Sequence, residues 1–141
     1  MSRTTFSGPV YSLAGFGQPI QYITALDTSP VAIEPGSQIV ILSPADGGPG
    51  GTIDLQLPEV FTTDGEPFNI NNADPRYIGI HGYILNYGGV DHNLIGTNSQ
   101  PVNGDAAGVT IAAGTSVQFA GNGNPTAAWA ASESNLCAGN T

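Results

Sequence analysis

The sequence predicts an all-β protein: a single β-sandwich or barrel-like domain, of jelly-roll or β-tulip-like type, that carries an extended N-terminal arm. Short runs of β-branched and aromatic residues recur along the chain, separated by turn residues. Twenty glycines and eleven prolines interrupt these runs, and helix signals are nearly absent. A chain of 141 residues has the usual size of one domain. The expected organisation is therefore an arm over residues 1–17 and one all-β domain over residues 18–141.

The first half of the chain contains three predicted strands. "PIQYITAL" (19–26) is rich in β-branched and aromatic residues. "SQIVILS" (37–43) is a continuous apolar run, which predicts a strand buried on both faces. "GTIDLQLPE" (51–59) alternates apolar and polar residues, which predicts a strand with one buried face.

The second half supplies the remaining strands. "RYIGIHGYILNY" (76–87) is dense in aromatics, and its Gly79 and Gly82 allow a bulge or the close approach of a neighbour. "VTIAAGTSVQFAG" (109–121) predicts two short strands joined by a turn at "AAG". A last strand is expected around Trp129, in preference to a helix in this alanine-rich segment.

Four clusters of Gly, Pro, Asn and Asp predict loops between these strands. They cover residues 43–51, 62–75, 96–108 and 121–125. The loop at 62–75 is rich in oxygen ligands for calcium, but its spacing matches neither the EF-hand nor the glycine-rich nonapeptide repeat, so turn formation is the favoured interpretation.

The charge balance excludes several classes of partner. The chain has no lysine, its basic residues are Arg3 and Arg76, and its net charge is −9. Because nucleic acids and anionic membranes are bound through Lys and Arg, neither is an expected partner. No stretch has the length or apolarity of a signal peptide or a membrane span, so synthesis in a cytoplasm is expected.

No motif predicts catalysis or a cofactor, and the protein is expected not to be an enzyme. The chain lacks a nucleophile elbow, a phosphate-binding loop and a dinucleotide-binding fingerprint. His81 and His92 have no Cys or His partners at zinc-ligand spacing, so a metal site would need a symmetric trimer that repeats one histidine about its axis. Cys137 is the single cysteine and has no basic neighbour in sequence that would activate it.

The N-terminal segment is the sequence's strongest candidate for a binding element. "TTFSGPVYSLAGFG" (4–17) combines large apolar side chains with glycines and a proline, a composition that suits an extended path over another surface. Its aromatic content is unusual for a tail that stays disordered. We therefore predict a docking arm whose partner-binding residues are Arg3, Phe6, Val10, Tyr11, Leu13 and Phe16.

The same segment resembles the opening of small structural proteins of tailed bacteriophages, which follow the pattern T-x-F-S-G-P-V-x-S-x-x-G-F. The later strands, including "GSQIVILSP", "GGTIDLQLPE" and "AAGTSVQFAGNGN", are loosely similar to phage fibre and decoration domains. The resemblance implies a capsid decoration (cement) protein or head fibre on the virion exterior, generally a homotrimer, whose partner is the major capsid protein. It implies a structural role that involves no cofactor.

An alternative is a host-adhesion or glycan-binding module of a phage fibre. Such a module would use Tyr77, Tyr83, Tyr87 and Trp129 as stacking platforms for sugars. The commoner fate of aromatic residues in strands is the core, and specific binding on a glycan array would separate the two interpretations.

Overall fold

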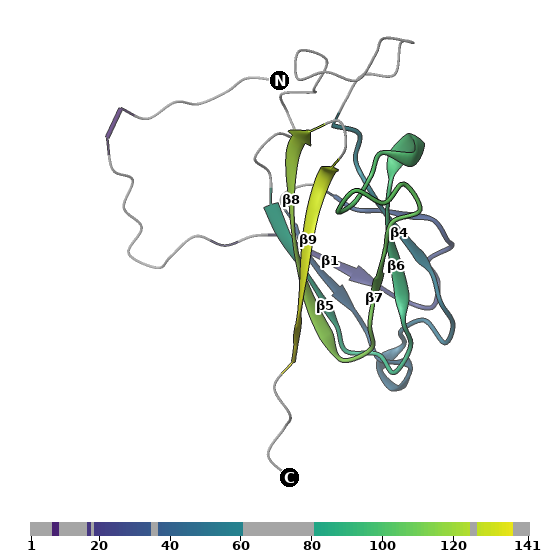
Figure 1. Ribbon diagram of the computed structural model, residues 1–141. Helices are drawn as coiled ribbons and strands as arrows, with labels where there is room; N and C mark the ends of the chain where they lie inside the picture. The colour runs from purple at the N-terminus through teal and green to yellow at the C-terminus, as the bar shows by residue number, and fades with distance from the viewer. Residues whose placement is uncertain are drawn as a thin grey trace.

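The computed structural model of the chain is an all-β sandwich. It describes residues 7–8, 17, 19–34, 37–60, 81–124 and 127–136. Two sheets, of five and four strands, pack against each other, as predicted (Figure 1). The helical turns among the described residues are short 3₁₀ turns, η1 (Pro44–Asp46) and η3 (Thr97–Ser99). None of the helices in this part of the chain is long and apolar enough to cross a membrane.

Each sheet is assembled from strands that are distant in sequence. The five-stranded sheet has the order β1 (Ile20–Ile23), β3 (Gln38–Ile41), β5 (His81–Asn86), β8 (Thr115–Asn124) and β9 (Ala127–Asn135). The four-stranded sheet has the order β2 (Val31–Ala32), β4 (Asp54–Leu57), β6 (His92–Gly96) and β7 (Val109–Ile111).

The chain alternates between the two sheets from β1 to β6, and this alternation makes neighbouring strands parallel. Strand β1 pairs with β3, β3 with β5, β2 with β4 and β4 with β6, all in parallel. Antiparallel pairing appears only later in the described strands, where β5 pairs with β8, β6 with β7, and β8 with β9. The chain thus connects the two strands of each parallel pair through a strand of the opposite sheet. In α/β proteins, the corresponding connection is a helix.

The core lies between the sheets and is formed by alternate residues of each strand, as the two-residue strand period requires. Trp129 is its largest member, and its indole Nε1 donates to the carbonyl oxygen of Pro58 at 3.0 Å. The ring of Phe119 lies edge-on to that indole, with ring centroids 5.9 Å apart. The other fully buried apolar side chains include Ile23, Ile39, Ile41, Leu55, Leu57, Val60, Ile84, Leu94, Val102, Ile111 and Ala128.

Gly82 permits the close approach predicted for it. Gly82 pairs with Phe119 across β5 and β8, and a Cβ atom at position 82 would lie 2.7 Å from the Phe119 ring. The missing side chain therefore leaves the space in which this ring packs. Gly79 lies outside the described residues.

Two buried polar side chains secure the loops at the ends of the sandwich. The Asn86 amide donates to the carbonyl oxygens of Val90 and Ala112, and its Oδ1 accepts from the backbone N–H of Gly88. The Gln100 Oε1 accepts from the backbone N–H of Val60 at 2.8 Å. These bonds satisfy backbone groups that the strand ladders leave unpaired, which burial would otherwise make costly.

The structure corrects several expectations of local structure. The run at 37–43 is buried on one face, because Ile39 and Ile41 point inward while Val40 is half-buried on the other side. The cluster at 121–125 was expected to be a loop, but β8 continues through its first four residues to Asn124, with a register shift. The predicted turn at "AAG" is present at Ala113 and Gly114, but it leads from β7 in one sheet to β8 in the other. Strands β2 and β6 were not predicted.

Candidate functional site

The six residues predicted to bind a partner lie outside the described residues: Arg3, Phe6, Val10, Tyr11, Leu13 and Phe16. The same is true of Cys137, Arg76 and the loop at 62–75. The described part of the chain therefore contains no lysine or arginine. It also contains no group of three or more His, Cys, Asp or Glu that could hold a metal ion.

The candidate site within the described residues is the outward side of the five-stranded sheet, which we call the outer face. Register and burial place thirteen side chains on it. These are Ile20 and Tyr22 of β1, Gln38 and Val40 of β3, His81, Tyr83 and Leu85 of β5, Ser116, Gln118 and Ala120 of β8, and Ala130, Ser132 and Ser134 of β9.

One half of the outer face, over β1, β3 and β5, is bulky and apolar. Tyr22 pairs with Val40, which in turn pairs with Leu85, so these three side chains lie side by side across three strands. Ile20, Tyr22 and Tyr83 are 49%, 54% and 44% exposed. Contiguous exposed apolar side chains of this size on a soluble domain mark an interaction surface.

The other half of the outer face, over β8 and β9, carries small side chains. Ala120 pairs with Ala130, and Gln118 pairs with Ser132. These four residues, with the adjoining backbone, line a shallow hollow of about 180 Å³ on the sheet. One sheet face thus offers large side chains on one half and a recess on the other.

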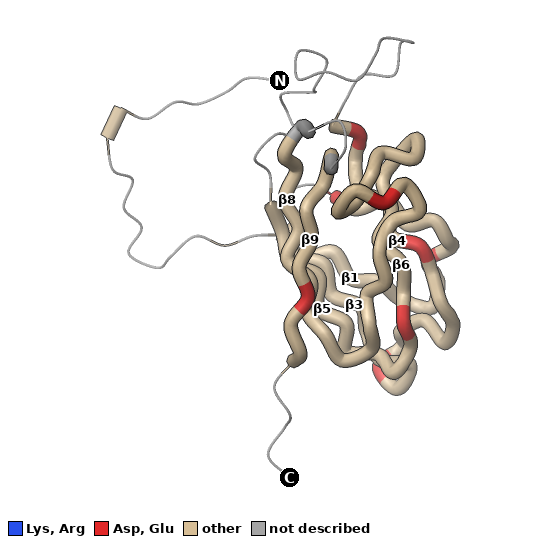
Figure 2. The backbone as a smooth tube through the Cα atoms, in the orientation of Figure 1, with Lys and Arg blue, Asp and Glu red and all other residues tan. Residues whose placement is uncertain are grey.

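The outer face is also free of formal charge, although the chain is strongly acidic. None of its thirteen side chains is an Asp, Glu, Lys or Arg. The acidic residues of the described backbone lie on loops, on the four-stranded sheet and at one inward-side position of β9 (Figure 2). They are Asp27, Glu34, Asp46, Asp54, Glu59, Asp91, Asp105 and Glu133. Depletion of charge at the centre of a surface is typical of protein interfaces.

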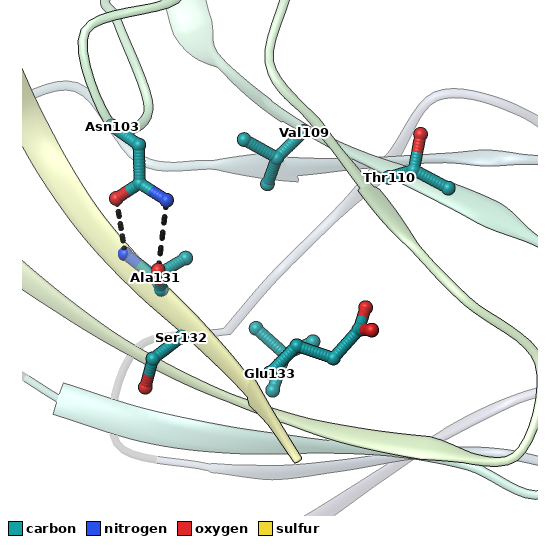
Figure 3. A pocket seen from close by; sticks show the side chains of 7 residues that line it. Asn103, Val109, Thr110, Ala131, Ser132 and Glu133 are labelled. Atoms are coloured by element: carbon teal, nitrogen blue, oxygen red, sulfur yellow. Dashed lines mark hydrogen bonds between the residues drawn. The ribbon is translucent and has the colours of Figure 1, made fainter. Parts of the chain in front are cut away.

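A second cavity, of about 270 Å³, lies where the edges of the two sheets meet, between β7 and β9 (Figure 3). At one end, the Asn103 side chain donates to the carbonyl oxygen of Ala131 and accepts from its N–H, both at 2.8 Å. At the other end, Glu133 accepts from the backbone N–H of Ala112 at 3.2 Å. Asn103 thus pairs with the free edge of β9 as a neighbouring strand would, and this side-chain pairing protects the edge from other chains.

The two histidines lie apart, His81 exposed on the outer face and His92 in the core of the other sheet. His92 is 1% exposed, and its Nδ1 accepts from the backbone N–H of Ile53 at 3.1 Å. Burial lowers the pKa of His92 below its usual 6.5, while the neighbouring carboxylate of Asp91 acts in the opposite direction. His92 is therefore a neutral structural residue.

The structure corrects one member of the proposed sugar-stacking set. Trp129 is fully buried, so it cannot stack on a ligand. Tyr83 and Tyr87 are exposed, at 44% and 56%, and Tyr77 lies outside the described residues. The members of the set that are exposed are thus Tyr83 and Tyr87, and Tyr22, which was not in the set, is exposed as well.

The outer face was not predicted, although the sequence contains a signal for it. A strand with one solvated face alternates apolar and polar residues, whereas consecutive apolar residues indicate that both faces are apolar. Such runs occur at Tyr22–Ile23, at Ile39–Val40 and at Tyr83–Leu85. These three strands are neighbours in one sheet, which assembles the runs into a surface.

Comparison with known proteins found no family that matches the chain and no curated protein sequence that matches it.

Proposed function

We propose that the chain is a structural protein of a tailed-bacteriophage virion, which binds the outside of the capsid and stabilises it. Its partners are the major capsid protein, contacted through the N-terminal segment 1–17, and further copies of itself. The resemblance of "TTFSGPVYSLAGFG" to phage structural proteins supports this role. The protein acts by binding and carries out no chemistry.

The observation that carries the proposal is that an apolar N-terminal segment is followed in sequence by a strand with exposed apolar side chains. The segment with Phe6, Tyr11 and Phe16 leads in sequence directly into β1. Strand β1 then exposes Ile20 and Tyr22, which open the bulky half of the outer face. A binding element followed at once by an uncharged apolar face suits a protein whose task is to hold other proteins together.

Stabilisation follows from the number of copies on a particle. A subunit that contacts adjacent capsid proteins adds buried interface at each of many equivalent positions. Individually weak contacts then act together, because once one contact has formed the next is effectively intramolecular. The acidic surface that faces away from the shell keeps decorated particles soluble.

The test is a co-sedimentation assay with capsids that lack the protein. The full-length variant with Phe6→Ser, Tyr11→Ser and Phe16→Ser is expected to bind about tenfold less tightly or worse, because each substitution removes a buried aromatic anchor. The matched control carries Thr4→Ala, Ser7→Ala and Ser12→Ala in the same segment and should bind as the unaltered protein does. Equal binding by both variants would contradict docking through this segment. Failure of the unaltered protein to bind any capsid would contradict the function itself.

Glycan binding is the second candidate, and the exposed Tyr83 and Tyr87 favour it. Specific signals on a glycan array that Tyr83→Ala abolishes would support adhesion. A blank array favours the structural role.

A further inference from the structure

We propose that two copies of this chain pack face to face through the outer face, related by a twofold axis. This pairing goes beyond the proposed function and does not depend on it, since it involves no capsid. Three features of the described residues carry it: the distribution of charge, the division of the face into bulky and small halves, and the strand order.

Charge makes a second copy the partner that this face suits. Two chains of net charge −9 repel each other over most of their surfaces. The outer face is the sheet surface on which the described residues place no carboxylate, so two copies can meet there without opposing like charges. By contrast, the outward side of the four-stranded sheet carries Asp54, and the loops carry most of the other acidic residues.

The two halves of the face are complementary in shape. Tyr22 and Ile20 project from β1, while Ala120, Ala130, Gln118 and Ser132 line the hollow of about 180 Å³ over β8 and β9. An isologous interface requires that whatever projects from one copy meets a recess in the other. The face supplies both the projection and the recess.

The strand order places these halves opposite each other. Strand β5 is the middle strand in the order β1-β3-β5-β8-β9. A twofold axis that lies in the interface along β5 places β1 of each copy over β9 of the other. The interface therefore contains two equivalent contacts between β1 and β9. Sheets that pack face to face cross at about 30°, which keeps the two sets of strands nearly aligned. The paired registers place Tyr22 level with Ser134, so each Tyr22 then lies over the small Ser134 of β9 in the other copy.

The expected association is reversible. Five strands about 4.8 Å apart give a face about 19 Å wide, which is small for a permanent interface. Gln38 and Gln118 add polar area, as in interfaces that form and separate. A ring of three copies needs two surfaces inclined to each other, whereas both halves of this interface lie on one sheet. The twofold pair is therefore favoured over the trimer that the resemblance implies.

The test uses the full-length protein and measures its mass by sedimentation over a range of concentrations. Tyr22→Lys and Ser134→Glu each place a charge in the interface and are expected to weaken pairing about tenfold or more. Both positions are exposed in the single chain, so both variants should keep its fold and unfolding midpoint. The matched control is Thr110→Glu, an exposed strand position on the other sheet, which should pair as the unaltered chain does.

Mixing the two variants tests the arrangement itself. In a mixed pair, Lys at position 22 of one copy faces Glu at position 134 of the other, while the second contact keeps both original residues. The mixture should therefore regain the pairing that each variant loses alone. A monomer at every concentration would overturn the proposal. So would pairing that Tyr22→Lys and Ser134→Glu leave unchanged, or a mixture that stays monomeric. Because this sedimentation experiment contains no capsid, none of its results decides whether the protein binds capsids.

Discussion

Acidification is expected to destabilise the fold through His92. The side chain is 1% exposed, its Nδ1 accepts from the Ile53 N–H at 3.1 Å, and its Nε2 is buried without a hydrogen-bond partner among the described residues. An acceptor at Nδ1 places the proton of the neutral ring on Nε2. A second proton would then sit on Nδ1, facing the N–H donor of Ile53, and would leave a charge in the core.

The sign and size of the effect follow from linkage. Burial lowers the pKa of folded His92 below 6.5, the usual value that the unfolded chain retains, and Asp91 offsets only part of this shift. The unfolded chain therefore binds more protons, and the free energy of unfolding falls as the pH falls below 6.5. The greatest slope for one group is about 1.4 kcal/mol per pH unit. Between pH 7 and pH 5.5 one such group can lower the free energy of unfolding by at most about 1.3 kcal/mol.

The assay is urea unfolding at several pH values for the unaltered chain, His92→Asn and His81→Asn. Asparagine at position 92 offers an acceptor to the Ile53 N–H and does not titrate. Asparagine is smaller than histidine and leaves a small cavity, which lowers the stability at every pH. The comparison therefore uses the slope of the free energy of unfolding against pH, and not its absolute value. The slope between pH 7 and pH 5.5 should disappear in His92→Asn and persist in His81→Asn. An unchanged slope in His92→Asn would refute the assignment of this titration to His92.

Two further predictions concern the contacts of β9 with Asn103 and around Trp129. Asn103→Gly keeps a residue suited to the positive φ of 53° but removes both hydrogen bonds to Ala131, so we expect urea unfolding to show a loss of about 1–2 kcal/mol. Asn103→Asp keeps the acceptor and should lose about half as much unfolding free energy. Equal stability of all three proteins would show that the Asn103 side chain does not stabilise the edge of β9. Trp129→Ala should cost about 3–5 kcal/mol and Trp129→Phe distinctly less, because phenylalanine keeps the packing against Phe119 and loses only the bond to Pro58. Thermal melts that rank the two variants equally would contradict a packing role for this ring.

Local patterns in the sequence account for most of the strands. The alternation in "GTIDLQLPE" reflects a side-chain period of two, and β4 has the predicted inward Leu55 and Leu57. Strand β6 escaped prediction because "HNLIG" places a histidine and a glycine at inward positions, where the pattern requires apolar residues. Strand β2 is two residues long and too short to show any period. The hydrogen bonds of Asn103 span 28 positions and that of Gln100 spans 40, so no local sequence pattern predicts them.

Of the two candidate binding sites, one can be recognised in the sequence and the other only in the tertiary structure. The apolar N-terminal segment is evident from composition alone, and its predicted role as a docking arm stays a prediction. The outer face depends on which strands become neighbours. Its bulky half needs β1, β3 and β5 side by side, in parallel, through connections that visit the other sheet.

The sequence alone determined that the chain is all-β, that it is acidic without lysine, and that it begins with an apolar segment, because these properties reside in composition and in the two-residue period. The tertiary structure alone decided that Trp129 is buried, that His92 is held neutral in the core, and that the uncharged residues of five strands share one surface. Pairing between strands is governed by contacts between residues far apart in the chain, and a local pattern carries no record of them.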